Sequence, residues 1–132
     1  MFKVIVVIPC YKVDKYILDV LSKIPLNKIF KVILIDDNCP NKTGQLIVKN
    51  NKNKKIKVIF LKKNLGVGGA TKKGIKAAIK HKPDAIIKID GDGQHDPKLL
   101  TDFINLQKKK PNSYIKGFRI LNYKYTPLLR YL

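Results

Sequence analysis

Short apolar runs alternate along this chain with segments whose apolar residues recur at helical spacing. The runs are rich in Val and Ile and have the length of buried strands; they cover residues 4–8, 32–35, 58–61 and 85–89. The helical patterns cover residues 14–24, 43–50, 70–80 and 97–107. Pro25 stops the first helix and Pro97 opens the last, because a proline ring is tolerated only in the first helical turn. A fifth strand is expected to begin at residues 114–115.

Strands that are apolar on both faces and alternate with helices predict an α/β fold. The sheet should be mostly parallel and covered by helices on both faces, as in a Rossmann-like domain. The 132 residues fit one domain of ordinary size, so residues 1–132 are interpreted as a single domain.

A polar or glycine-rich segment follows each predicted strand. These segments are Pro9-Cys10-Tyr11, Asp36-Asp37-Asn38, Asn64 with the glycines at 66, 68 and 69, and Asp90-Gly91-Asp92-Gly93-Gln94-His95. In open α/β sheets, ligands bind beyond the carboxyl ends of the strands. All four segments should therefore meet at one edge of the sheet and form a binding site there.

Asp90 and Asp92 are the strongest candidates for chemistry at that edge. Residues i and i+2 of an extended backbone point the same way, so both carboxylates should face one side. Paired carboxylates suit a hard cation such as Mg²⁺ or Mn²⁺, which also binds phosphate oxygens. Gln94 and His95 could each add a ligand atom, and Gly91 would allow a ligand to approach closely. The alternative is a solvated turn, in which Asp and Gly are ordinary residues.

Two further segments could contact a nucleotide. Asp37 could accept hydrogen bonds from a base or ribose, or it could simply cap a helix or turn. The glycines at 66, 68 and 69 precede a predicted helix whose amides would attract a diphosphate. Lys72 and Lys73 fall in the first turn of that predicted helix and could help to hold the phosphates; the alternative is a tight loop with surface lysines.

The charge balance is strongly basic. The chain has 28 Lys and Arg against 9 acids, for a net charge of +19, and it contains no Glu. Such a surface attracts membranes, phosphorylated ligands or nucleic acid. Lys, Asn and Ile also rise together in genomes rich in A and T, and we favour that explanation with a solvated surface. The acids are more informative, because five of the nine lie in residues 36–37 and 90–96, where clustering is unfavourable without a cation or hydrogen-bond donors.

The cysteines and the length of the apolar segments indicate the cellular setting. Cys10 and Cys39 are the only cysteines; we expect reduced, packed thiols in a cytosolic protein, with a disulfide or redox pair as the alternative. No segment approaches the roughly 20 apolar residues of a membrane-spanning helix.

Four segments, taken together in order and spacing, resemble glycosyltransferase family 2, and within it the polyprenyl-phosphate sugar transferases. They read VIPCYKVDKYI, VILIDDNCPNKTG, NLGVGGATKKGIKAA and DAIIKIDGDGQHDP. A further segment, SYIKGFR, looks like the glycine-x-arginine strand of the family. The resemblance implies the GT-A fold and a site for a nucleoside diphosphate sugar, either a UDP- or a GDP-sugar. It also implies that the C-terminal acceptor part of the family is missing from this chain.

The resemblance assigns roles to residues of this chain. Those implied to hold the nucleotide sugar are Pro9, Tyr11, Asp37, Gly68, Lys72, Asp90 and Gly91. Asp90, Asp92 and Gln94 would surround a Mg²⁺ or Mn²⁺ ion. Asp92 and Arg119 would be catalytic, and Arg119, with Arg130 as a further candidate, would meet a phosphate. Val13 stands where the family often has Glu, which weakens one expected base or ribose contact.

The expected function is transfer of a sugar to an acceptor in cell-envelope glycan synthesis. No carboxylate follows Asp102 to act as a base toward a hydroxyl acceptor. A polyprenyl phosphate needs no such base, because its phosphate is already ionised; a glycan is the other acceptor implied. The setting would be cytoplasmic, at or near a membrane surface as a peripheral protein, without a nucleic-acid partner. The alternatives are a catalytically incomplete binding module and a basic nucleic-acid binder.

Overall fold

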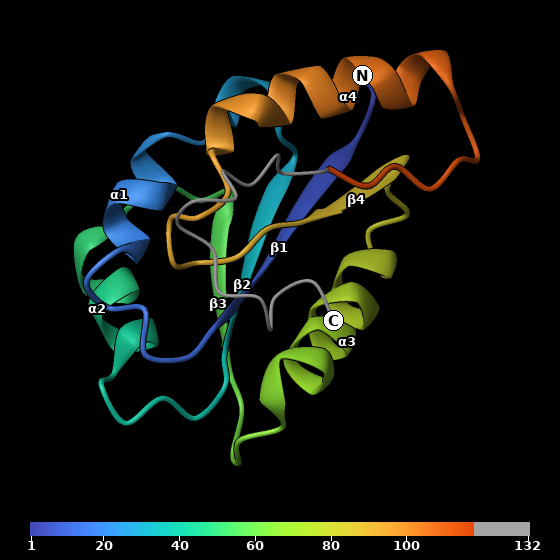
Figure 1. Cartoon of the computed structure of the whole chain (residues 1–132). Coiled ribbons are helices and arrows are strands. Elements are labelled where there is room, and N and C mark those ends of the chain that lie inside the picture. The colour runs from blue at the N-terminus through green and yellow to red at the C-terminus, as the bar shows by residue number, and fades with distance from the viewer. Residues whose placement is uncertain (118–132) are drawn as a thin grey trace, which may run out of the picture.

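The computed structural model describes residues 1–117, and its centre is a sheet of four parallel strands (Figure 1). The strands lie in the order β3-β2-β1-β4. Their bounds are Val4–Cys10 for β1, Lys31–Asp36 for β2, Ile56–Phe60 for β3 and Ala85–Lys88 for β4. All three pairings are parallel, so the predicted parallel α/β sheet is confirmed.

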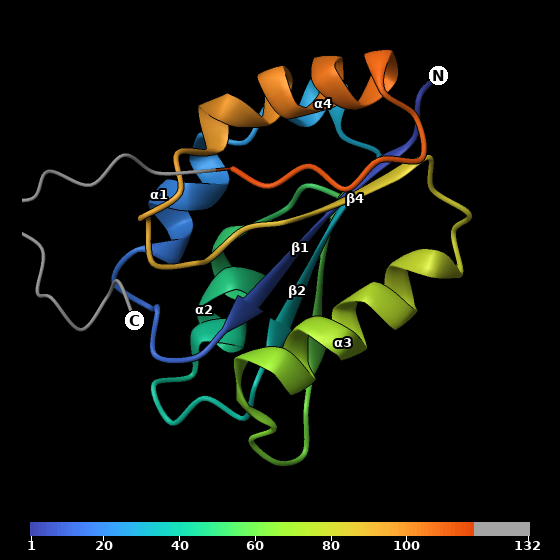
Figure 2. The same cartoon turned by 45° about the vertical axis from the view of Figure 1, so that its right-hand side comes forward.

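Helices cover both faces of the sheet, as expected (Figures 1 and 2). The helices on one face are α1 (Ile17–Ser22), α2 (Thr43–Asn50) and α4 (Leu100–Lys109). The other face carries α3 (Gly66–Ile79). Two short 3-10 helices, η1 (Leu26–Lys28) and η2 (Pro97–Leu99), complete the regular structure of residues 1–117.

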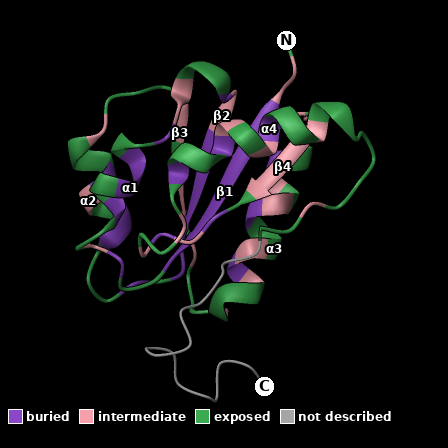
Figure 3. Ribbon diagram, turned by 45° about the horizontal axis from the view of Figure 1, so that its top comes forward, coloured by how far each residue is buried: buried purple, intermediate pink, exposed green. Residues whose placement is uncertain are grey.

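The sheet divides the core into two clusters, because successive side chains of a strand point to opposite faces. In β1, Val4, Val6 and Ile8 pack toward α1 and α4, whereas Ile5 and Val7 pack toward α3. Every residue of β1 is buried (Figure 3). The central strand is therefore apolar throughout, which is why its sequence shows a continuous run without alternation.

Helix α3 packs close to the sheet through Gly74. A Cβ atom at this position would lie 2.3 Å from Val7 Cγ1 and 3.2 Å from Ile35 Cγ1. Ala70 and Ala78 lie one turn to either side of Gly74 and are fully buried. This line of small residues lets the helix backbone approach β1 and β2 directly.

Several expected limits of elements, and one expected strand, differ from the structure. Helix α3 begins at Gly66 rather than at residue 70, so Lys72 and Lys73 lie in its second turn, not its first. Helix α1 is shorter than the pattern at 14–24, since residues 14–16 form a turn. No strand forms at residues 114–115: within the described chain this segment pairs with no strand, and Tyr114 is 90% exposed.

The strand order creates a point where the chain reverses direction across the sheet. From β1 the chain moves outward through β2 to β3, and α3 then returns it to β4 on the other side of β1. The connections leaving β1 and β4 therefore diverge to either side. In open α/β sheets, such a switch point is where ligands bind, at the carboxyl ends of the strands.

Candidate functional site

The polar segments predicted to converge do meet at the carboxyl edge of the sheet. Hydrogen bonds connect the ends of neighbouring strands: Asp37 N donates to Cys10 O at 3.0 Å, and Leu61 N donates to Asp36 O at 2.9 Å. On the other side of β1, Ile89 N donates to Val7 O at 3.1 Å, and Asp90 follows at once. The loops after all four strands thus start from one rigid edge.

Asp37 ties the end of β2 to the loop before α3. Its Oδ1 accepts the backbone N–H of Leu65 at 2.7 Å, and its carbonyl accepts from Asn64 Nδ2 at 3.3 Å. Only 2% of the residue is exposed. Its second oxygen, Oδ2, makes no hydrogen bond within residues 1–117, and is the atom through which Asp37 could meet a ligand.

Asp36, the neighbouring carboxylate, has a structural role that the sequence left open. Its Oδ1 accepts from Cys39 N at 2.8 Å and its Oδ2 from Gly44 N at 2.6 Å. Gly44 lies in the first turn of α2, whose free amides attract negative charge. The two acids at 36–37 point to opposite faces of the sheet, so one caps a helix while the other borders the site.

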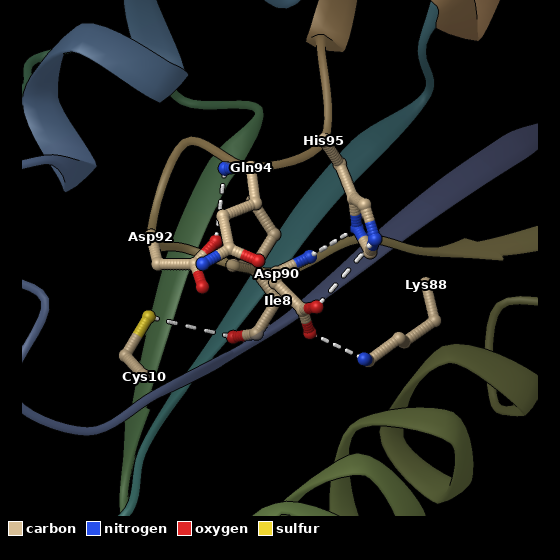
Figure 4. Close-up of polar contacts among 7 residues, drawn as sticks. All are labelled: Ile8, Cys10, Lys88, Asp90, Asp92, Gln94 and His95. Carbon is tan, nitrogen blue, oxygen red and sulfur yellow. Dashed lines mark hydrogen bonds and ion pairs between the residues drawn. The ribbon is translucent and has the colours of Figure 1, made fainter. Parts of the chain in front are cut away.

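Asp90 is held from two sides (Figure 4). The Lys88 ammonium forms an ion pair with Asp90 Oδ1. His95 contacts Asp90 twice: its Nδ1 accepts the Asp90 backbone N–H at 3.1 Å, and its Nε2 lies 3.6 Å from Asp90 Oδ2. Because Nδ1 accepts a hydrogen bond, the ring proton belongs on Nε2, facing the carboxylate. Both ring nitrogens of His95 are thus directed at Asp90 rather than at a metal position.

Asp92 begins a tight turn. Its Oδ1 accepts from Gln94 N at 3.0 Å, which leaves Oδ2 available to a ligand. Gly93 has a φ of 78°, a value that favours glycine, and no atom lies within 4 Å of where its Cβ would be.

Gly91 serves the core beneath that turn. A Cβ there would lie 3.1 Å from Val13 Cγ2 and 3.2 Å from Ile17 Cδ1. The absence of a side chain at position 91 thus lets the turn after β4 pack tightly on Val13 and α1.

The donor atoms at this turn fit a cation that arrives with a diphosphate. Within residues 1–117, no three His, Cys, Asp or Glu side chains gather closely enough to hold a metal ion by themselves. Mg²⁺ is commonly bound by one or two carboxylates and completed by substrate phosphates and water. Asp92 offers a free carboxylate oxygen, and Asp90 a carboxylate whose present partner is an exposed ammonium that a divalent ion could displace.

The remaining predicted residues border the same edge or lie outside the described chain. Pro9 is buried near the end of β1, and Tyr11, just after it, is 42% exposed with Lys12 Nζ 5.4 Å from its ring centroid. Gly68 and Lys72 are exposed in the first and second turns of α3. Arg119 and Arg130 lie outside the described residues.

The two cysteines are free and buried, but their environments differ. Burial, together with the negative charge of Asp36 and the nearby Cys39, raises the pKa of the Cys10 thiol. At Cys39 burial acts in the same direction, but hydrogen bonds from Thr43 and from the amides of Lys12 and Asn41 outweigh it and lower the pKa. Cys39 Sγ lies 3.1 Å from both Lys12 N and Thr43 Oγ1, so it joins the loop after β1 to the start of α2.

Sequence reasoning missed the partners that fix these carboxylates. The sequence alone does not indicate a role for Lys88, because this residue stands inside an apolar run and its ion-pair partner is only two residues further on. The sequence suggests His95 as a metal ligand, whereas in the structure both ring nitrogens face Asp90. The i, i+2 spacing of Lys88 and Asp90 on an extended backbone was the one available signal.

Comparison with known proteins gives consistent results. The model of the family described as "Glycosyl transferase family 2" matches residues 5–130. A UDP-N-acetylglucosamine–dolichyl-phosphate N-acetylglucosaminyltransferase of Methanococcus voltae is 31% identical, over 89% of this chain and 52% of that protein. A dolichol-phosphate mannosyltransferase of Pyrococcus furiosus is 26% identical, over 93% of this chain and 36% of that protein.

The fold has solved counterparts as well. The crystal structure of S. aureus TarS 1-349 in complex with UDP matches with a TM-score of 0.65 and 26% identity, over 81% of this chain and 32% of that chain. The present chain spans between 32% and 55% of the length of the curated relatives compared with it. In residues 1–117, no helix is long and apolar enough to cross a membrane.

Proposed function

Because the chain belongs to glycosyl transferase family 2, we propose that it binds a nucleoside diphosphate sugar with a divalent cation and takes part in transferring the sugar to an acceptor. The observation that carries the proposal is the position of Asp90 and Asp92. Both carboxylates directly follow β4 at the switch point of the sheet, and Asp37 borders the same edge from β2. This is where a parallel sheet binds nucleotides.

In the proposed site, the nucleoside lies across the ends of β1 and β2, beside Pro9, Tyr11 and Asp37. The diphosphate lies between the turn at 90–94 and the start of α3. There, Gly68 lets the backbone approach and Lys72 lies one turn further along the helix.

Asp92 Oδ2, Asp90 and Gln94 would hold a Mg²⁺ or Mn²⁺ ion. When bound, this ion supplies positive charge that stabilises the leaving diphosphate. The protein's own task is to keep Asp92 and Asp90 in place, through the turn at Gly93 and through the contacts of His95.

The acceptor that best fits the chain is a polyprenyl phosphate, with a glycan as the other candidate. The names of two relatives contain dolichyl or dolichol phosphate. In the transfer, an acceptor phosphate oxygen attacks the anomeric carbon, and the bond from that carbon to the nucleoside diphosphate breaks. Since the attacking oxygen is already ionised, no side chain has to remove a proton. A lipid acceptor places the reaction at the cytoplasmic surface of a membrane, with Arg119 or Arg130 as candidate phosphate contacts.

A UDP-sugar is the first donor to test. One relative is named for UDP-N-acetylglucosamine, and the solved TarS counterpart holds UDP. A GDP-sugar is the second. A catalytically incomplete module would bind the same donors without turnover, so binding and turnover are separate questions.

Calorimetry with UDP- and GDP-sugars, with and without Mn²⁺, tests the donor site. We expect Mn²⁺-dependent binding that weakens by about tenfold or more in Asp92→Asn, because the substitution removes a charged metal ligand. Asp102→Asn is the matched control, since Asp102 is exposed on α4 away from the site, and its affinity should equal that of the unaltered chain. Absence of binding by either donor, or equal loss in both variants, would refute the proposal.

A further inference from the structure

Charge is distributed very unevenly along this chain. Residues 38–83, which contain α2, β3 and α3, include 13 lysines and not one of the nine acidic residues. The acids are confined to residues 14–37 and 84–102. Uniform enrichment in lysine would not remove every acid from 46 consecutive residues, so this part of the chain carries its positive charge without acidic neighbours in sequence.

Helix α3 presents this charge as one exposed face. Lys72, Lys73, Lys76, Ile79 and Lys80 are all exposed and share one side of the helix, and we call them the lysine face. The opposite side, with Ala70, Gly74 and Ala78, is buried against the sheet. In Figure 3, α3 is accordingly coloured partly as exposed and partly as buried.

The lysine face has no counter-charge in the described chain. Within residues 1–117, salt bridges occur at Asp19 and Asp90, and neither involves a lysine of α3. Lys72 with Lys76, and Lys76 with Lys80, are like charges one helical turn apart, which repel each other. Repulsion among these lysines is thus unfavourable in the free protein, and contact with an anionic surface would reduce it.

The electropositive region extends beyond the end of α3. Partial burial lowers the pKa of His81, and the ammonium groups of Lys31, Lys57 and Lys3 lower it further. His81 immediately follows Lys80. The imidazole of His81 thus lies in the positive potential of the lysines around the end of α3.

We infer that the lysine face of α3 is a docking surface for an anionic lipid membrane. Lysine ammonium groups are flexible point charges that suit a fluid layer of phosphate headgroups, with no need for fixed geometry. The face is about 12 Å long, and it carries one apolar side chain, Ile79, which is 57% exposed. It has neither the aromatic side chains nor the arginines with which proteins commonly hold single-stranded nucleic acid.

The start of α3 borders the candidate donor site, because Leu65 donates its N–H to Asp37. Docking through this face would therefore bring the site edge next to the lipid surface. The apolar side of α3 is packed on the sheet, so the helix cannot insert an apolar face into the lipid. The attraction is therefore electrostatic, and high salt should abolish it. The inference stands apart from the proposed function, because vesicle binding requires neither donor nor acceptor.

The test is sedimentation of the full chain with vesicles of phosphatidylcholine alone or mixed with phosphatidylglycerol. We expect binding to the anionic vesicles only, reversed at high salt. Lys76→Gln with Lys80→Gln should weaken it by roughly tenfold or more; Lys72 and Lys73 are left intact because both are candidates to contact the donor phosphates. The matched control substitutes Lys109 and Lys110 by Gln. These lysines are exposed at the end of α4, on the other face of the sheet, and their loss should change binding by less than about twofold.

Equal weakening in both double variants would overturn the inference, since net charge alone would then explain binding. So would binding to neutral vesicles, or a larger effect of the α3 substitutions on single-stranded RNA binding than on vesicle binding. Circular dichroism checks that both variants fold. Calorimetry with the donor keeps the two proposals apart, because the α3 variant should bind nucleotide sugar normally.

Discussion

At the scale of single residues, the site depends on what holds each carboxylate in place. Asp90 has Lys88 on one oxygen and His95 near the other, while Asp92 is fixed through the N–H of Gln94. Groups that orient a metal ligand commonly affect affinity by ten- to a hundredfold when removed. His95 is therefore a positioning residue for Asp90. Its Nδ1 fixes the backbone of Asp90 by accepting the Asp90 N–H.

Substitution of His95 tests this role. An Asn side chain can place an oxygen near the position of Nδ1 and still accept the Asp90 N–H, whereas Ala cannot. We expect Mn²⁺-dependent donor affinity to fall about tenfold in His95→Ala and clearly less in His95→Asn. His81→Ala, at the other histidine, should leave the affinity unchanged. If Asn and Ala at 95 are equally impaired, the hydrogen bond to Nδ1 is not what positions Asp90.

At the scale of elements, glycines serve two purposes in α3: they form its first turn, and Gly74 lets it pack closely on the sheet. Glycine is unfavourable inside helices, so the sequence predicted a helix only from residue 70. The structure starts it at Gly66, where Asn64 Oδ1 accepts the Gly66 N–H at 3.0 Å and Asp37 anchors Leu65. Tertiary anchoring of the first turn thus outweighs the poor helix propensity of its glycines.

Two glycines of α3 should respond in opposite directions to the same substitution. Gly74→Ala places a Cβ 2.3 Å from Val7 Cγ1, and the overpacking should destabilise the protein by about 1–3 kcal/mol. Gly68→Ala meets no atom within 4 Å and should stabilise it by roughly 0.5–1 kcal/mol, through helix propensity. Urea unfolding measures both, and the same sign for both would contradict the packing of α3 on β1.

At the scale of the whole molecule, the dominant quantity is the net charge of +19. Mutual repulsion of this size opposes the compact state. The two Lys–Asp salt bridges in residues 1–117 offset little of it, since both are at least partly exposed.

Salt should therefore stabilise the protein. We expect the urea midpoint to rise as NaCl increases from about 20 to 300 mM, because the screening length shortens to a few ångströms. Sucrose at matched osmolality is the control for general exclusion effects. A midpoint that stays constant or falls with NaCl would show that repulsion is not a significant term in the stability.

The sequence by itself determined the fold class, the four strands, the four helices to within a few residues, and the gathering of polar segments at one edge. These follow from local periodicity and from the rule that parallel strands end on the same side. The prediction failed where glycine obscured a helix start, and at residues 114–115, which pair with no strand among residues 1–117.

Only the tertiary structure decided which strands are neighbours and which atoms face one another. Lys3 meets Asp84 across 81 positions of sequence, and β1 lies between β2 and β4, so the switch point falls beside Asp90. The structure also decided that Asp36 caps α2 while Asp37 borders the site, and that His95 and Lys88 hold Asp90. Periodicity along a chain describes each element alone, whereas these choices depend on packing between elements that the chain brings together only on folding.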